Sequence, residues 1–369
     1  MNPSSLLPDL PSGAQIVLIR LRSIGDVILL TPAIHMLKEW RPDLEISVVV
    51  ESRFRELLEG NPDIQELLDP GSGSGVAKIA ARLRAIRTIR ERKFSMCVNL
   101  HGGPTGTLLT RASGAKMKVG FEYYRSRGVY DVLVPDTRKI LGKNEVHTTE
   151  HQTAIFFHLG MPRREIPRAR IFVKDEHRDW WRQKSQEVRF SATGRYAVIQ
   201  PTALYATKQW AAEHFARLGK FLKDEAGLLP IYSCGPGESH VLDAVERASK
   251  NSILRLESVS LGQFAAAIEG ARIFVGNDSG PAHMAAALGR PGVVIFGSSS
   301  SVIWGPWPRD PARARIVQNS FACNPCPGDR CYQFERPECI LSVTFEQVRA
   351  AVKGVLRATQ ESETGDRRE

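Results

Sequence analysis

A capped helix with an early histidine is the most distinctive chemical feature of this sequence. In NDSGPAHMAAALGRP (277–291), an apolar run gives way to an acid, a hydroxyl and a glycine. Asp278 and Ser279 are suited to cap the helix that follows, and Gly280 fits its first turn. The start of such a helix offers unpaired N–H groups and a partial positive charge, which favour phosphate. His283 could donate toward the same ligand; the alternative is a capped, buried helix without one.

Two further loops follow apolar, strand-like runs in the same half of the chain. QPTALYATKQW (200–210) offers the Thr202 hydroxyl and the Lys208 cation, which could neutralise a departing diphosphate. CGPGE (234–238) is a glycine-rich turn in which Glu238 could accept from a nucleotide hydroxyl. The alternative for both is an ordinary solvated loop.

A third candidate lies near the amino end, in LRSIGDVILLTPAI (21–34). Asp26 follows the first apolar run, where it could act as a general base that removes a proton from an acceptor hydroxyl. It could equally cap the helix that begins there, and the two roles are compatible.

Four of the six cysteines are clustered near the carboxyl end. Cys323, Cys326, Cys331 and Cys339 are separated by two, four and seven residues, which is shorter than a paired-knuckle zinc site. A structural metal, disulfide or redox pairing, and free thiols all remain open for this cluster.

Alternating apolar strands and amphipathic helices must position these residues. The pattern begins at 14–21, restarts at 195–203, and predicts two doubly wound α/β domains with parallel sheets. We expect a helix over 27–40, a linker over 162–179, and domains at 1–170 and 171–345, followed by a helix and disordered tail at 346–369. In such sheets ligands bind beyond the carboxyl ends of the strands.

Charge and hydropathy limit the classes of partner that we expect for this protein. The 369 residues carry a net charge of +10, and basic residues are concentrated at 78–93. This stretch suits an anionic membrane face, a phosphorylated substrate or a solvated helix face. It lacks interleaved aromatics and any nucleic-acid-binding signature, so we expect no nucleic-acid partner. No secretory signal or apolar run of spanning length is present, which predicts a cytoplasmic protein.

Taken in order, these stretches resemble glycosyltransferase family 9, the heptosyltransferases of lipopolysaccharide core assembly. The resemblance runs from IVLIRLRSIGDVILLTPAI through VNLHG, HTTEHQTAIFFHLG, QPTALYATKQWAAEHF and CGPGE to VGNDSGPAHMAAALGRPGVVIFG. It implies a GT-B architecture, with two facing Rossmann-like domains and a cleft between them. It also implies transfer of a heptose from an ADP-activated donor, with inversion and no catalytic metal, to an anionic glycolipid acceptor.

The resemblance also implies residue roles. Asp26 matches the catalytic base, and Lys208 matches the lysine beside the donor phosphates. The donor-binding positions are Thr202, Lys208, Glu238, Asp278, Ser279, Gly280 and His283. Charge on the diphosphate would also be met by the N–H groups of the 281–284 turn, while Asp278 would cap the helix or contact the sugar.

Two other functions remain open. The chain could be another GT-B enzyme of sugar nucleotides, such as an epimerase, or a non-catalytic module that binds a nucleotide sugar. Peripheral contact with the cytoplasmic face of the inner membrane would suit a lipid-linked acceptor and the basic first half.

Overall fold

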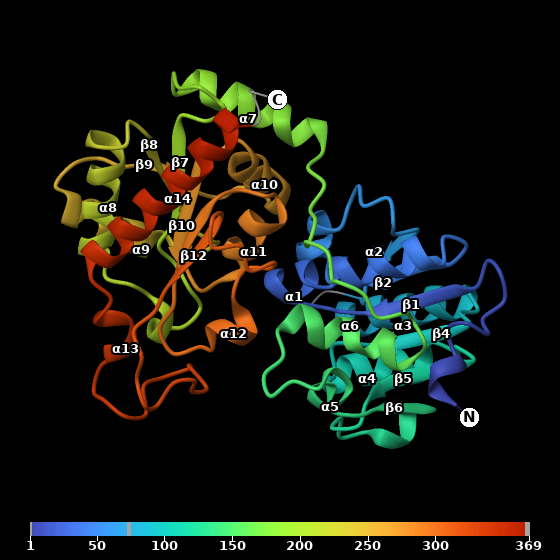
Figure 1. The fold of residues 1–369 in the computed structure, drawn as a ribbon. Helices are drawn as coiled ribbons and strands as arrows, with labels where there is room; N and C mark the ends of the chain where they lie inside the picture. Colours follow the sequence, from blue (N-terminus) through green and yellow to red (C-terminus); the bar gives the residue numbers. More distant parts are fainter. Residues whose placement is uncertain (1, 72–74, 366–369) are drawn as a thin grey trace. The chain divides into compact units, whose positions relative to one another are not determined.

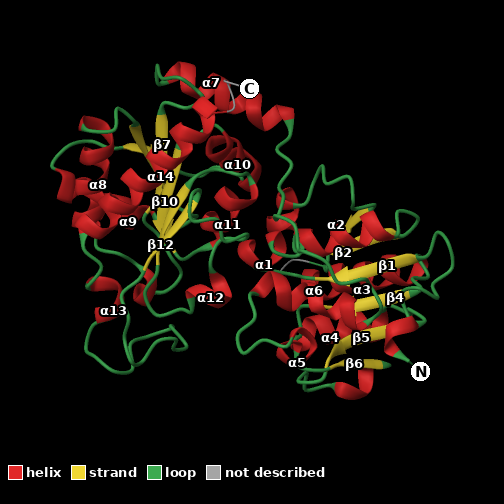
Figure 2. Cartoon of the chain, in the orientation of Figure 1, coloured by secondary structure: helices red, strands yellow, loops and turns green. Residues whose placement is uncertain are grey.

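The computed structural model describes residues 2–71 and 75–365, which form two compact units (Figures 1 and 2). The units are Met1–Phe172 and Val173–Glu369. Each contains one six-stranded parallel sheet. The prediction of two doubly wound α/β units is confirmed.

The sheet of the first unit has the order β3-β2-β1-β4-β5-β6. Its strands are β1 (Gln15–Ile19), β2 (Glu45–Val49), β3 (Glu66–Leu68), β4 (Met96–Asn99), β5 (Met117–Phe121) and β6 (Val132–Val134). The central strands are almost fully buried, as expected for a parallel sheet covered on both faces. Their carboxyl ends therefore carry the loops that are free to bind ligands.

Helices and short 3-10 turns connect these strands. They are η1 (Pro3–Ser5), α1 (Ile24–Ile28), α2 (Thr31–Trp40), η2 (Ser52–Leu57), α3 (Gly75–Glu91), α4 (Gly103–Ala112), η3 (Arg127–Val129), α5 (Thr137–Leu141) and α6 (Thr148–His158). The single helix predicted over 27–40 is wrong in this detail. Pro32 cannot donate to the carbonyl of Ile28 and its ring crowds that group, so α1 ends at Ile28 and α2 begins at Thr31.

The sheet of the second unit has the order β12-β11-β10-β7-β8-β9. Its strands are β7 (Tyr196–Gln200), β8 (Leu229–Ser233), β9 (Leu254–Leu256), β10 (Ile273–Asn277), β11 (Gly292–Ile295) and β12 (Ala314–Val317). Numbered within each unit, both sheets have the strand order 3-2-1-4-5-6. The first and fourth strands are thus neighbours in each unit, and the chain reverses direction across the sheet between them.

The second unit has its own set of helices. They are α7 (Asp175–Glu187), η4 (Ala206–Lys208), α8 (Ala212–Asp224), α9 (Ser239–Ser249), α10 (Leu261–Glu269), α11 (Gly280–Ala287), α12 (Ser301–Trp304), α13 (Glu338–Leu341) and α14 (Phe345–Gly365). The start of α7 falls inside the linker predicted over 162–179. None of the helices in the described ranges is long and apolar enough to cross a membrane.

The last helix completes the core of the second unit. In Figure 1, α14 (red) lies along the sheet of this unit. Val348, Val352 and Val355 are fully buried there, in one cluster with Ile199 of β7 and Val293 of β11. The tail predicted as disordered is therefore helical as far as Gly365, and residues 366–369 lie outside the described part of the chain.

Candidate functional site

An ion pair joins two of the predicted donor-binding residues at the carboxyl edge of the second sheet. Lys208 ends the short turn η4 in the loop after β7, and Asp278 directly follows β10. Lys208 Nζ lies 2.8 Å from Asp278 Oδ2. The Asp278 side chain is only 6% exposed and that of Lys208 22%, so the ammonium is the partner that remains open to a ligand. The pairing of these residues was not anticipated from the sequence.

The start of α11 differs from its predicted form. Ser279 is the N-cap residue, with an extended backbone, but its hydroxyl makes no capping bond and donates to the Asn277 carbonyl oxygen at 3.3 Å. Asp278 does not cap this helix either, because its carboxylate is turned to Lys208. The expectation that the N–H groups of the 281–284 turn meet a phosphate needs correction. Pro281 has no N–H, and the N–H of Ala282 donates to the Ser279 carbonyl.

The remaining groups at this end of α11 define what the site can offer an anion. The backbone of Gly280 has no Cβ, so a ligand can approach it closely. His283 lies in α11 itself and is 6% exposed. Together with the Lys208 ammonium and the positive end of the helix dipole, these groups favour negative charge beside Ser279.

Asn277 fixes the position of both loops. Its Nδ2 donates to the Pro201 carbonyl at 2.8 Å, and its Oδ1 accepts from the Trp210 N–H at 3.2 Å. The side chain is fully buried at the end of β10. Because these two bonds hold both ends of the 201–210 loop, Asn277 sets where Lys208 stands relative to Asp278. Sequence reasoning did not single out this residue.

Thr202 and Glu238 lie in the loops after β7 and β8, but both are engaged internally. The Thr202 hydroxyl accepts from Gln200 Nε2 at 2.6 Å and is 2% exposed. The Glu238 carboxylate folds back to accept the Gly235 N–H at 2.8 Å. Each side chain therefore shapes its own loop in this structure.

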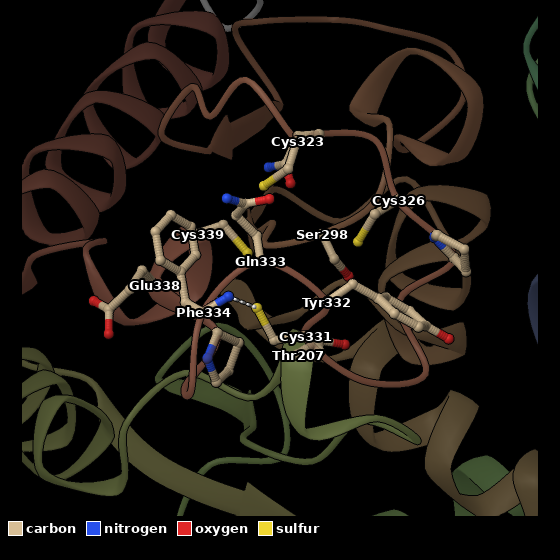
Figure 3. A pocket seen from close by; sticks show the side chains of 13 residues that line it. Thr207, Ser298, Cys323, Cys326, Cys331, Tyr332, Gln333, Phe334, Glu338 and Cys339 are labelled. Carbon is tan, nitrogen blue, oxygen red and sulfur yellow. Dashed lines mark hydrogen bonds between the residues drawn. The ribbon is translucent and has the colours of Figure 1, made fainter.

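The four clustered cysteines also belong to this unit. Cys323, Cys326, Cys331 and Cys339 are free thiols that line one pocket (Figure 3). The disulfide alternative is not seen in this structure.

The predicted base lies in the first unit, at the carboxyl edge of its sheet. Asp26 occupies the third position of α1, and its Oδ2 accepts from the Ser23 N–H at 3.4 Å and from the Ser23 hydroxyl at 3.3 Å. Its Oδ1 forms an ion pair with Arg20 Nη2. The capping role is thus observed, and the carboxylate remains 19% exposed, so the cap leaves it accessible to an acceptor.

Arg20 and His101 lie near Asp26 at this edge of the sheet. Arg20 also donates to the Leu100 carbonyl, which connects the loops after β1 and β4. Burial, together with the positive charges of Arg20 and Arg22, lowers the pKa of His101. The hydroxyl of Tyr124 donates to the Asn99 carbonyl at 3.2 Å. Basic, imidazole and phenolic groups are thus present together at this edge of the first sheet.

Two histidines stand at the start of α6: His147 is its N-cap residue and His151 lies in its first turn. His147 caps the helix, since its Nδ1 accepts the Thr149 N–H at 3.1 Å. The His151 ring stacks on Phe121, with centroids 4.5 Å apart, and lies 2.8 Å from the Thr137 hydroxyl. Burial lowers the pKa of His151 to about 4, so it is neutral near pH 7.

Comparison with known proteins identifies the family. The model of glycosyltransferase family 9 (heptosyltransferase) matches residues 82–333. The chain belongs to glycosyltransferase family 9. It is 28% identical to lipopolysaccharide heptosyltransferase 3 of Escherichia coli K12 over 295 residues, which cover 78% of this chain and 83% of that protein.

Solved structures show the same fold. A family 9 glycosyltransferase from Veillonella parvula superposes with a TM-score of 0.79 at 21% identity, covering 93% of this chain and 97% of the other. The ADP-heptose lipopolysaccharide heptosyltransferase II of Escherichia coli superposes with a TM-score of 0.76 at 20% identity, covering 94% and 99%. The chain therefore has the GT-B-like fold of a family 9 glycosyltransferase.

Proposed function

We propose that this family 9 glycosyltransferase transfers a heptose from ADP-heptose to a lipopolysaccharide-core acceptor, with inversion at the anomeric carbon. The observation that carries the proposal is the Lys208–Asp278 pair at the start of α11, which places a cation and a helix amino end at one edge of a Rossmann-like sheet. The names of the similar heptosyltransferases support heptose and ADP as the donor components.

In the proposed mechanism Asp26 acts as the general base. It accepts the proton of the acceptor hydroxyl while that oxygen attacks the anomeric carbon from the face opposite ADP. Ser23 and Arg20 hold the carboxylate in one orientation. Negative charge grows on the departing diphosphate and is met by the Lys208 ammonium and by the backbone at Gly280. Asp278 keeps the ammonium in place, and we expect transfer to need no catalytic metal.

The test compares the two charged residues in steady-state transfer from ADP-heptose to a truncated lipopolysaccharide core. Asp26→Asn should lower kcat about 100-fold or more, because a general base contributes at least that much, and should leave the donor KM unchanged. Lys208→Met should raise the donor KM and lower kcat as well. Asp63→Asn, a carboxylate paired with His35 in the same unit, is the matched control and should retain activity.

Two outcomes would contradict the proposal. Binding of the nucleotide sugar by a wild-type chain that transfers no sugar would favour a non-catalytic binding module. Conversion of a sugar nucleotide into its epimer without transfer would favour the alternative enzyme class.

We further propose that helix α3 brings the protein to the cytoplasmic face of the inner membrane, where an anionic glycolipid acceptor resides. Ile79 and Leu83, one turn apart on α3, are 63% and 62% exposed, and Leu108 of α4 is 47% exposed. Arg84 and Arg87 are exposed on the same helix. Exposed apolar side chains among arginines match an interfacial helix on anionic lipid.

Vesicle co-sedimentation tests this contact. The protein should bind vesicles containing phosphatidylglycerol better than pure phosphatidylcholine, and less strongly in high salt. Because each basic side chain contributes about 1 kcal/mol, replacing Arg84 and Arg87 with glutamine should weaken binding about 30-fold. Val188→Ser, at an exposed apolar residue of the second unit, is the control. Equal binding by the double variant would rule out α3 as the contact.

A further inference from the structure

An exposed tyrosine stands at the carboxyl edge of the first sheet, in the loop after β5. The Tyr123 side chain is 60% exposed, whereas every other Phe, Tyr or Trp among the described residues of the first unit is buried or half-buried. A single exposed apolar side chain needs no functional explanation by itself. The contacts that hold this ring make it unusual, because they fix a side chain that contributes little to the core.

Two contacts fix the orientation of the Tyr123 ring. The ring stacks on the buried Phe121 ring, with centroids 5.3 Å apart and planes inclined by 15°. Its hydroxyl lies 3.1 Å from His151 Nε2, and His151 Nδ1 lies 2.8 Å from the Thr137 hydroxyl. A neutral imidazole has one donor and one acceptor nitrogen, so it can bond both hydroxyls at once. With one face against Phe121, the ring presents its other face to solvent.

Helix α6 connects this ring to the proposed base. His151 contacts Tyr123, and the next residue, Gln152, donates from Nε2 to the Asp26 carbonyl at 3.1 Å. Burial has the largest effect on the pKa of His151, and the charges of Arg20 and Asp26 also act on it. In the order β1-β4-β5, the strands that precede Asp26 and Tyr123 are two spacings apart, about 10 Å or roughly the span of a disaccharide. The ring therefore has a fixed position relative to the base.

A rigid tyrosine ring that faces solvent is well suited to bind one face of a sugar. A pyranose face that carries C–H groups has a partial positive charge, which complements the negative face of an aromatic ring. Contact between the two also removes apolar surface from water. Because the ring is held in place before the ligand arrives, little side-chain entropy is lost on binding.

We propose that Tyr123 is a specificity-determining residue of the acceptor site, on which the C–H face of the acceptor sugar stacks. The hydroxyl groups at the rim of that sugar are then free to extend toward Asp26. A sugar with an axial hydroxyl on the stacked face binds less well, because that hydroxyl loses its water against the ring. The inference rests on the proposed function, since it assigns this surface to the acceptor.

Steady-state transfer from ADP-heptose, with the concentration of a truncated lipopolysaccharide core varied, tests the proposal. Tyr123→Ala should raise the acceptor KM about 10-fold and leave the donor KM unchanged. Tyr123→Trp should retain a low acceptor KM, because it keeps an aromatic face. The effect of Tyr123→Ala should be the same in low and high salt, since stacking is not screened as a charged contact is. Tyr332→Ala, at a tyrosine of the second unit that is 57% exposed, is the matched control and should not change the acceptor KM.

The outcomes separate this inference from the proposed function. An unchanged acceptor KM for Tyr123→Ala, in a chain that transfers heptose, would overturn the inference alone, and so would a raised donor KM or an equal effect of Tyr332→Ala. If Tyr123→Ala does not fold, Tyr123→Leu, which keeps apolar bulk without a ring face, takes its place. If the wild-type chain transfers no heptose, the proposed function fails. Saturation-transfer NMR with the isolated core oligosaccharide then decides: contacts to sugar C–H protons that Tyr123→Ala loses support the stacking surface, and their absence from the wild-type chain overturns it.

Discussion

The two units place an asparagine at the same position of the same topology and use it differently. Asn99 ends the fourth strand of the first sheet, and Asn277 ends the fourth strand of the second. Asn99 Oδ1 accepts the N–H groups of His101 and Gly102, which shapes the loop that follows it, and its Nδ2 donates to the Tyr130 hydroxyl at 2.9 Å. Asn277 instead reaches across to the loop after β7. One scaffold position thus shapes the backbone of its own loop in the first unit, whereas in the second it holds both ends of the loop after β7.

The acids of the two units differ in the same way. Asp26 pairs with Arg20, which lies six residues earlier, directly after β1, and keeps part of its carboxylate exposed. Asp278 is buried and pairs with Lys208, which comes from another loop. A locally held, accessible carboxylate suits proton transfer. A buried carboxylate is better suited to hold a cation in place.

The largest expected effect comes from breaking the Lys208–Asp278 pair. Lys208→Met leaves a buried carboxylate without its cation and should lower the free energy of unfolding by about 3 kcal/mol in urea denaturation. Lys208→Met with Asp278→Asn should recover most of this loss but should not restore donor affinity. If Lys208→Met is as stable as wild type, Asp278 does not depend on the lysine and the contrast with Asp26 fails.

Replacing the two asparagines separates their roles. Asn277→Ala and Asn99→Ala each leave buried polar groups without partners and should each cost about 2 kcal/mol. Only Asn277→Ala should raise the donor KM, because it releases the loop that carries Lys208. Measuring unfolding and donor KM for both variants checks this. A raised donor KM in both would mean that the effect follows from lost stability alone.

Two adjacent glycines lie in the segment after β4, and replacing each of them with alanine gives a matched pair of variants. Gly102 and Gly103 both have positive φ, but a Cβ on Gly102 would lie 2.8 Å from Tyr124 Cε1, while one on Gly103 has nothing within 4 Å. Gly103→Ala should cost about 1 kcal/mol from backbone strain alone. Gly102→Ala should cost about 1 kcal/mol more, because the Tyr124 ring must move. Equal losses in thermal unfolding would show that the ring adapts freely.

The effect that is smallest at neutral pH is a pH dependence in the first unit, which develops only as the pH is lowered. The pKa of His151 is about 4 in the folded protein, below its ordinary value near 6.5. Between these values the unfolded chain binds a proton that the folded chain does not, so stability falls as the pH is lowered through this window. His151→Asn should flatten that part of the stability–pH curve. A curve with an unchanged slope would show that other groups cause the loss.

The sequence predicted the fold well because the strands are buried runs with few polar residues. It missed α7, whose residues 175–187 are almost all polar and present only Trp181 and Ser185 to the interior. With so narrow an apolar face, this helix resembles a linker in sequence. The break between α1 and α2 was signalled by Pro32, which our prediction of one continuous helix did not weigh.

The sequence allowed us to predict residues of the candidate sites, but not how their side chains are arranged in space. Lys208 and Asp278 are 70 residues apart, and no local pattern shows that their side chains meet. Its residue type and its place before a helix both predict that Asp278 is a helix cap. The bond that its carboxylate makes is instead the long-range ion pair with Lys208. The roles of Asn99 and Asn277 could not be predicted for a related reason. An asparagine at a strand end is common, and the partners of Asn277 come from another loop.

Because α14 belongs to the core of the second unit, the two units can complete their folding at different stages of synthesis. The core of the second unit joins β7, its first strand, to Val348, Val352 and Val355 near the end of the chain. The first unit has all of its strands and helices by residue 172. On the ribosome, the unit that contains Asp26 can therefore fold while the unit that contains Lys208 still lacks α14. Under the proposed function, the acceptor side would form first, and binding of the sugar nucleotide would have to wait until α14 had been synthesised.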